Sequence, residues 1–229
     1  MTNETSTAPP IDNWVSIGET MIAFATTDDP RHYEAVVAGA ESNVAMGQAR
    51  LGLPARWVSR LGEDPLGELI ADVVSGAGVD VDVVHDPQRP TGVMTKYVTP
   101  DGTRGQYYRA GSAASALSVD DLARIGTVDR VHVTGITPAL STSAAALVAA
   151  IVERDDWHVS FDVNYRPALW PNAGEAAETL VGLARQADLV FLGEDEASAL
   201  FGIRDPGELV EVITRRPGQE LVMKRGAEG

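Results

Sequence analysis

The sequence predicts an α/β, Rossmann-like fold in which a mostly parallel sheet is flanked by helices. Short apolar segments alternate along the chain with helical patterns, and this alternation is typical of βα units. Glycine or polar residues follow each apolar segment, as expected where strands end at a sheet edge. One stretch, residues 92–109, departs from the alternation. The candidate core strands are residues 15–17, 56–59, 130–133, 158–161, 189–192 and 220–223.

Helix start and stop signals lie between these strands. Side-chain oxygens of Ser and Asp are well suited to accept the unpaired N–H groups at a helix N-terminus, and glycine favours the end of a helix. The expected helices are residues 43–51, closed by Gly52; residues 65–76, opened by Asp64 and Pro65; and two that begin at Ser118 and Ser141.

The departing stretch predicts a β-hairpin. Two strand-like segments flank Asp101-Gly102, which is a common hairpin turn pair. Together with strand patterns at residues 21–25 and 32–37, the hairpin predicts a small antiparallel β layer beside the main sheet. We expect this layer, from about residues 20–38 and 91–110, to act as a lid over the crevice at the sheet edge.

Composition limits the class of protein. Of 229 residues, 44% are hydrophobic, enough for one large domain over residues 13–229, and residues 1–12 are expected to form a disordered tail. The net charge of −15 makes nucleic acid and membrane surfaces unfavourable partners. The chain has no cysteine and four scattered histidines, so a thiolate or histidine metal site is not expected, and a cytoplasmic location is the default.

A polar cluster follows the strand at residues 158–161. Asp162, Asn164 and Arg166 lie where ligands bind in open α/β sheets. The planar, permanently charged guanidinium of Arg166 suits a carboxylate or phosphate, and Arg109 offers a second one. We therefore expect a small anionic substrate. The alternative is a turn whose side chains satisfy only their own backbone.

Two further segments predict contacts to the same ligand. Gly39-Ala40 allows close approach of the backbone, and Asn43 offers both a donor and an acceptor to hydroxyl groups. Tyr107 and Arg109 are two residues apart in a strand pattern and so face one side. The alternatives are a glycine turn that only begins a helix and an exposed hairpin with a solvated arginine.

At this point the motifs resemble the ribokinase or PfkB family of carbohydrate kinases, and most of all the 2-keto-3-deoxygluconate kinases. The resemblance implies a ribokinase-like fold and ATP-dependent phosphorylation of a sugar or sugar-acid hydroxyl with Mg²⁺. The segments that carry it are Gly18-Glu19, residues 39–45, residues 60–67, residues 107–115, Asp162-Val163-Asn164-Tyr165-Arg166 and residues 222–229.

Site residues follow from the resemblance. Glu196 matches an acid that organises the water around Mg²⁺, although Gly193 replaces the usual asparagine, and carboxylates at a helix start are also favoured by the helix dipole alone. The implied substrate-binding residues are Gly39, Ala40, Asn43, Tyr107, Arg109, Asp162 and Arg166, and the implied nucleotide-binding residues are Asn164, Lys224, Gly226 and Gly229.

The catalytic base is expected downstream of Gly229. In the family it lies in a Gly-Ala-Gly-Asp segment at a helix N-terminus, whereas Gly76-Ala77-Gly78 here ends a helix. We therefore expect a domain incomplete at its C-terminus and a chain that is inactive as given. The alternatives are a fructokinase or ribokinase, and a non-catalytic sugar-binding relic. A dehydrogenase is disfavoured because no Gly-x-Gly-x-x-Gly follows the first strand. Exposed lid strands suggest a possible homodimer.

Overall fold

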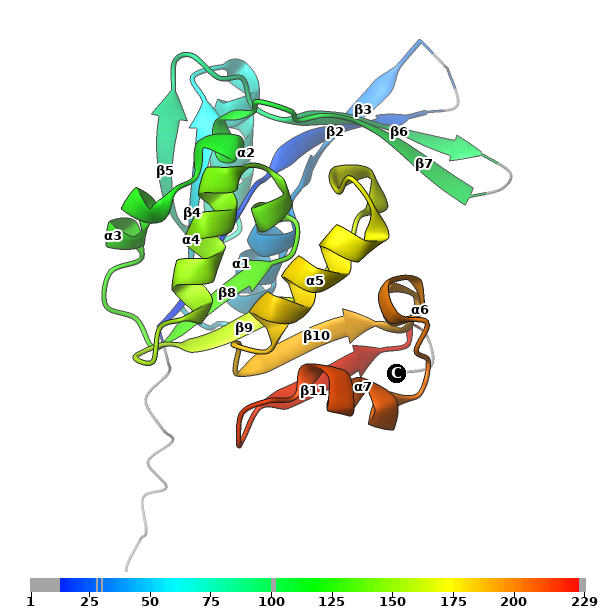
Figure 1. Cartoon of the computed structure of the whole chain (residues 1–229). Helices are drawn as coiled ribbons and strands as arrows, with labels where there is room; N and C mark the ends of the chain where they lie inside the picture. The colour runs from blue at the N-terminus through cyan, green and yellow to red at the C-terminus, as the bar shows by residue number, and fades with distance from the viewer. Residues whose placement is uncertain (1–12, 28, 30, 100–101, 227–229) are drawn as a thin grey trace, which may run out of the picture.

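The computed structural model describes residues 13–27, 29, 31–99 and 102–226 (Figure 1). Seven strands form the main sheet in the order β11-β10-β9-β8-β1-β4-β5, and every neighbouring pair in it is parallel. Its strands are β1 (Trp14–Ile17), β4 (Ala55–Gly62), β5 (Asp80–Asp86), β8 (Arg130–Thr134), β9 (His158–Asp162), β10 (Leu189–Gly193) and β11 (Glu220–Lys224).

The six predicted core strands are all present, but β5 was missed. This edge strand pairs only with β4 and carries Asp80, Asp82 and Asp86, which are unusual residues for a strand. Asp82 forms ion pairs with Arg56 of β4 and Arg124, so its charge is compensated by neighbours that the local sequence does not reveal.

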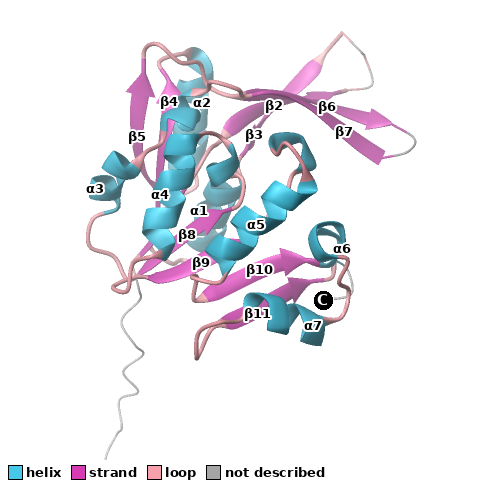
Figure 2. Cartoon of the chain, in the orientation of Figure 1, coloured by secondary structure: helices cyan, strands magenta, loops and turns pink. Residues whose placement is uncertain are grey.

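Helices cover both faces of the main sheet (Figure 2). Asp64 and Ser141 cap α2 and α4 as predicted, whereas α1 begins at Ala40, three residues before the expected start, with Gly39 as its N-cap. The α-helices are α1 (Ala40–Arg50), α2 (Pro65–Gly76), α3 (Leu122–Ile125), α4 (Thr142–Val152), α5 (Ala173–Ala184), α6 (Glu194–Phe201) and α7 (Pro206–Ile213), with 3-10 turns η1 (Ala113–Ala116), η2 (Val119–Asp121), η3 (Thr137–Ala139) and η4 (Pro167–Leu169).

Two hydrophobic cores lie against the main sheet. One fills the space between the sheet and α4 and α5, with Leu147 and Phe161 fully buried. The other joins α1, α2 and β4 around Trp57 and Ile70. Burying apolar surface on both faces is what a parallel sheet requires. No helix within the described ranges is both long enough and apolar enough to cross a bilayer.

The second sheet is the predicted small β layer, has the order β3-β2-β6-β7 and is called the lid below. The β6–β7 hairpin is confirmed, although residues 100–101 between its strands lie outside the described residues. Residues 1–12, for which a disordered tail was expected, lie outside them as well. The expectation of a wholly antiparallel layer is wrong, because β2 and β6 pair in parallel. Both strands begin next to each other at the edge of the main sheet, where Ile22 N–H donates to Gly92 O at 3.2 Å. They extend away from it in the same direction and are therefore parallel. The strands are β2 (Met21–Thr26), β3 (Tyr33–Ala38), β6 (Val93–Thr99) and β7 (Gly102–Tyr108).

Asp64 connects the base of the lid to α2. Its Oδ1 accepts N–H groups of Leu66 and Gly67 at 3.1 and 2.8 Å, and its Oδ2 accepts the N–H of Thr91 at 2.8 Å. Burial alone would raise the pKa of Asp64, but the hydrogen bonds from Thr91, Gly67 and Leu66 prevail and lower it. The carboxylate thus caps a helix and also holds the segment that leads into β6.

Asp64→Ala is expected to lower the free energy of unfolding by about 2 kcal/mol, since it removes a helix cap and a second backbone contact. Asp64→Asn keeps an acceptor for the cap and should lose less. Because the folded pKa is lowered, this stabilisation is present above about pH 4 and is lost as the pH falls below it. Urea unfolding of the three proteins at pH 7 and pH 3.5 measures both effects, and equal stability of wild type and Asp64→Ala would contradict them.

His132 is a buried ionisable group in the centre of the main sheet. Its Nδ1 lies 2.7 Å from Ser160 Oγ, and its side chain is almost inaccessible. Burial lowers its pKa to about 4; nearby Asp162 opposes the shift and Lys224 adds to it. The imidazole is therefore neutral in the folded protein near pH 7.

Lowering the pH from 7 to 5 should reduce the stability of wild type by about 2 kcal/mol more than that of His132→Asn. The unfolded chain binds the proton near pH 6.5, so the stability contributed by neutral His132 is lost as the pH falls from there toward 4. Urea unfolding at both pH values measures the difference. Parallel pH dependence of the two proteins would show that His132 titrates normally in the fold.

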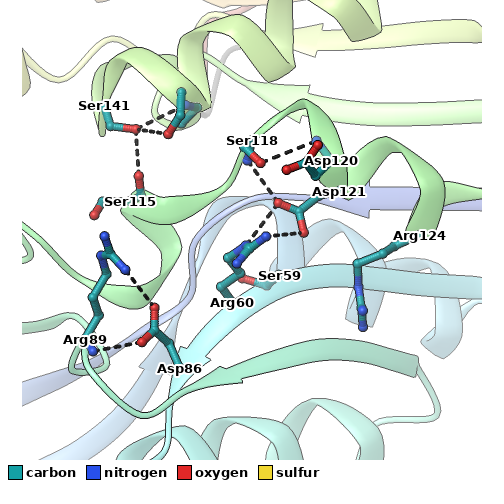
Figure 3. Close-up of polar contacts among 12 residues, drawn as sticks. Ser59, Arg60, Asp86, Arg89, Ser115, Ser118, Asp120, Asp121, Arg124 and Ser141 are labelled. Atoms are coloured by element: carbon teal, nitrogen blue, oxygen red, sulfur yellow. Dashed lines mark hydrogen bonds and ion pairs between the residues drawn. The ribbon is translucent and has the colours of Figure 1, made fainter.

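A buried ion pair fastens β4 to the segment after the lid (Figure 3). Arg60 donates from Nε and Nη2 to the two carboxylate oxygens of Asp121, both at 3.0 Å, and Asp121 also accepts the N–H of Ser118 at 2.9 Å. Asp121 is 1% exposed. The arginine that begins the Arg60-Leu61-Gly62 motif therefore has a structural role.

Candidate active site

A cavity of about 270 Å³ lies between the lid and the end of the main sheet. It collects side chains from β2, β6, β7, α1 and the segment after β9, which are far apart in the sequence. Its lining residues are Glu19, Met21, Ala38, Gly39, Ala40, Asn43, Met94, Tyr107, Arg109, Ile136, Asn164 and Arg166. The structure thus brings together six of the seven residues that the sequence indicated for the substrate.

The seventh, Asp162, does not line this cavity. Both of its carboxylate oxygens accept from Lys224 Nζ at 2.7 Å, across the end of β10. Asn164, indicated for the nucleotide, instead lines this first cavity. It is the only described non-glycine residue with a positive φ, 40°, a conformation that asparagine tolerates better than most residues. Such strain is often found at ligand sites.

Gly39 forms the wall of the cavity at the start of α1. A Cβ atom placed on it would lie 2.2 Å from Thr20 Oγ1 and 2.9 Å from Glu19 O, so no larger residue fits. The close approach brings Ala40 and Asn43 to the cavity. The packing of Thr20 and Glu19 at the base of the lid therefore requires glycine at this position.

Arg109 follows β7 and is almost completely buried. Its Nη2 forms an ion pair with Glu19 Oε2, and its guanidinium lies 5.7 Å from the centre of the Tyr107 ring. Burial raises the pKa of Glu19, against the opposing effects of Arg109 and Ser112. Sequence analysis gave Glu19 no role. The available signal was its position directly after β1, at the sheet edge where ligands bind.

A second buried acid, Glu41, anchors the start of α1. Thr134 and Thr137 donate to its Oε1 at 2.7 and 2.8 Å. Complete burial raises the pKa of Glu41, against these two hydrogen bonds, which favours the neutral acid. A Cβ atom on Gly18 would lie 2.1 Å from the Glu41 carboxyl carbon, which explains the glycine after β1.

Arg166 lies at the junction of this cavity with a second one of about 380 Å³. Its side chain is about half exposed, donates to Tyr165 O at 3.2 Å and approaches Glu196 Oε1 at 3.7 Å. The second cavity contains three cationic and three acidic side chains. Its lining residues are Arg166, Gly193, Glu194, Asp195, Glu196, Lys224, Arg225 and Gly226.

The second cavity contains three of the residues indicated for nucleotide and metal: Glu196, Lys224 and Gly226. Gly229 lies outside the described residues. Glu196 Oε2 accepts the N–H of Gly193 at 2.8 Å, which closes the first turn of α6. Among the residues that the structure describes, no group of three His, Cys, Asp or Glu side chains is arranged to hold a metal ion. Mg²⁺ usually keeps several waters and is held by one or two carboxylates together with phosphates, so the place of Glu196 in this cavity is compatible with contact to such an ion through water.

The two adjoining cavities and the lidded parallel sheet define a kinase-like α/β protein, and residues 12–229 belong to the pfkB family of carbohydrate kinases. Two similar relatives are the 2-dehydro-3-deoxygluconokinases of Thermoproteus tenax and Bacillus subtilis, 37% and 34% identical over 228 residues. Each match covers 94% of this chain and 70% of the relative. Fructokinase-1 of Zea mays is 31% identical over 91% of this chain and 68% of its own length.

Solved structures agree with the fold. The PfkB protein from Polaromonas sp. JS666 has a TM-score of 0.86 and 32% identity, covering 95% of this chain and 78% of that one. A sugar kinase from Pyrococcus horikoshii in complex with ATP has a TM-score of 0.75 and 26% identity, covering 82% and 66%. The chain is thus a sugar kinase of the PfkB family with a small-molecule sugar substrate, and ATP is the expected phosphoryl donor.

Proposed function

We propose that the cavity beneath the lid binds 2-keto-3-deoxygluconate, the sugar acid also named 2-dehydro-3-deoxygluconate, for phosphorylation by ATP. The observation that carries this proposal is that Arg109 and Arg166, from distant parts of the chain, line one cavity. Two guanidinium groups suit a carboxylate. Gly39, Ala40, Asn43 and Tyr107 line the same space and are suited to the rest of the sugar.

The proposed ATP site is the second cavity, with Lys224 and Gly226 on its wall and Gly229 following them. Arg166 faces both cavities and can interact with negative charge that develops between sugar and nucleotide, which is the main electrostatic demand of phosphoryl transfer. Mg²⁺ would neutralise phosphate charge, with Glu196 holding its water shell.

Asp162 and Asn164 exchange roles in this proposal. Because Lys224 holds both oxygens of Asp162, this acid orients the lysine at the proposed ATP site instead of contacting the sugar. Asn164, on the wall of the first cavity, contacts the sugar.

Calorimetric titration of the chain with 2-keto-3-deoxygluconate, fructose and ribose tests the substrate. We expect the sugar acid to bind at least about tenfold more tightly than either neutral sugar, because a charge-assisted contact contributes about 1.5–3 kcal/mol. Equal or tighter binding of a neutral sugar would contradict the proposal.

A fructokinase activity is the second candidate. The observation in its favour is the Glu19–Arg109 ion pair, which lowers the net positive charge of the cavity. The same titration decides between the two, since a fructokinase would prefer fructose to the sugar acid.

We also propose a homodimer through the lid. The edge strands β3 and β7 leave backbone groups available for pairing, and Tyr33, Val36, Tyr97 and Tyr108 are exposed on the lid. Sedimentation equilibrium of wild type and Tyr108→Glu tests this proposal. A monomer at all wild-type concentrations would exclude it.

A further inference from the structure

The connections between the main sheet and the lid meet at Glu19. This residue joins β1 to β2, and its Oε1 accepts the hydroxyl of Ser112, beyond the end of β7, at 2.5 Å. A Cβ atom placed on Gly92, at the start of β6, would lie 2.7 Å from the same oxygen. Glu19 therefore lies between the segments that lead into β6 and out of β7, and its side chain is 0% exposed.

Arg109 depends on this carboxylate. The side chains of Arg109 and Glu19 are 7% and 0% exposed, so both groups are largely removed from bulk water. A buried guanidinium needs a counter-charge, because an uncompensated buried cation is strongly unfavourable. The Glu19 carboxylate pairs with Nη2 on one edge of the Arg109 guanidinium. The centre of the Tyr107 ring lies 5.7 Å from the same guanidinium.

We propose that Glu19 is the positioning residue for Arg109: it holds one edge of the guanidinium so that the group stays in the cavity wall, oriented for a substrate carboxylate. This inference rests on the proposed sugar-acid function. Without the carboxylate of Glu19, the cation would turn toward solvent, where water can solvate its charge. Binding of the sugar acid would then have to restore the displaced arginine.

The test compares wild type with Glu19→Gln, which keeps the size of the side chain and removes its charge. By calorimetry we expect Glu19→Gln to bind 2-keto-3-deoxygluconate about tenfold more weakly, with ATP affinity within about twofold of wild type. Glu178→Gln, the same change on the exposed face of α5, is the matched control and should bind both ligands as wild type does.

A structural role for Glu19 would produce different results. In an Arg109→Met background, Glu19→Gln should change sugar-acid affinity by less than about twofold, because the residue through which it acts is gone. Glu19→Asp keeps the charge but shortens the reach by one methylene, and its sugar-acid affinity should fall between those of wild type and Glu19→Gln. This variant also supplies the comparison if Glu19→Gln does not fold.

The proposal is overturned if Glu19→Gln binds the sugar acid as tightly as wild type, if ATP affinity falls in parallel, or if the loss persists in the Arg109→Met background. An acid affinity of Glu19→Asp equal to that of wild type, or below that of Glu19→Gln, would also overturn it. A failure of the proposed function can be told apart from a failure of this inference. In that case wild type itself would show no preference for the sugar acid over neutral sugars.

Discussion

Arg166→Ala is expected to weaken binding of 2-keto-3-deoxygluconate by about 2 kcal/mol, or roughly 30-fold. The change removes a guanidinium that can engage the carboxylate, and the half-exposed position of the side chain keeps the loss below that of a fully buried contact. Sequence reasoning alone predicts that ATP binding barely changes. Because Arg166 also lines the second cavity, we expect ATP affinity to fall as well, by about threefold.

Calorimetric titration of Arg166→Ala with both ligands measures these changes. Arg204→Ala, an arginine change at an exposed position after α6, is the matched control and should leave both affinities as in wild type. Unaltered sugar-acid affinity in Arg166→Ala would assign Arg166 to the loop that it stabilises through Tyr165 O rather than to the ligand.

Asp121→Ala is expected to lower the free energy of unfolding by about 3–4 kcal/mol. It leaves Arg60, whose side chain is 21% exposed, without the carboxylate that accepts two of its hydrogen bonds, and it leaves Ser118 N–H without its acceptor. Removing one partner of a buried ion pair is more harmful than removing both. We therefore expect Arg60→Met combined with Asp121→Leu to be less destabilised than the sum of the single changes.

Urea unfolding monitored by circular dichroism measures these stabilities. Asp120→Ala, at the adjacent exposed position, is the control and should change stability by less than about 0.5 kcal/mol. A loss below about 1 kcal/mol for Asp121→Ala would mean that water, and not Asp121, solvates Arg60 in the folded protein.

The architecture was largely predictable because its signals are local. Apolar runs located six of the seven strands of the main sheet, and Asp64 and Ser141 showed where α2 and α4 begin. β5 was missed because Asp82 is stabilised by Arg56 and Arg124, partners 26 and 42 residues away. The parallel pairing of β2 with β6 also depends on where two distant segments leave the core, which no local pattern records.

The candidate site was predictable to the same extent. A glycine just before a helix and an arginine just beyond a strand both indicate a ligand site from local sequence alone. Gly39, Arg109 and Arg166 do line one cavity. Asp162 was assigned to the sugar because the sequence does not reveal that Lys224, 62 residues away, donates to its carboxylate. Glu19 received no role because an acid between glycine and threonine is usually an exposed turn residue, whereas here the segments before β6 and after β7 bury it.

A crystal structure of the protein with bound 2-keto-3-deoxygluconate tests the central claim most directly. We expect the sugar acid beneath the lid, with carboxylate oxygens within about 3 Å of guanidinium nitrogens of both Arg109 and Arg166. A sugar acid bound outside this cavity, or bound in it with its carboxylate turned away from both arginines, would contradict the account.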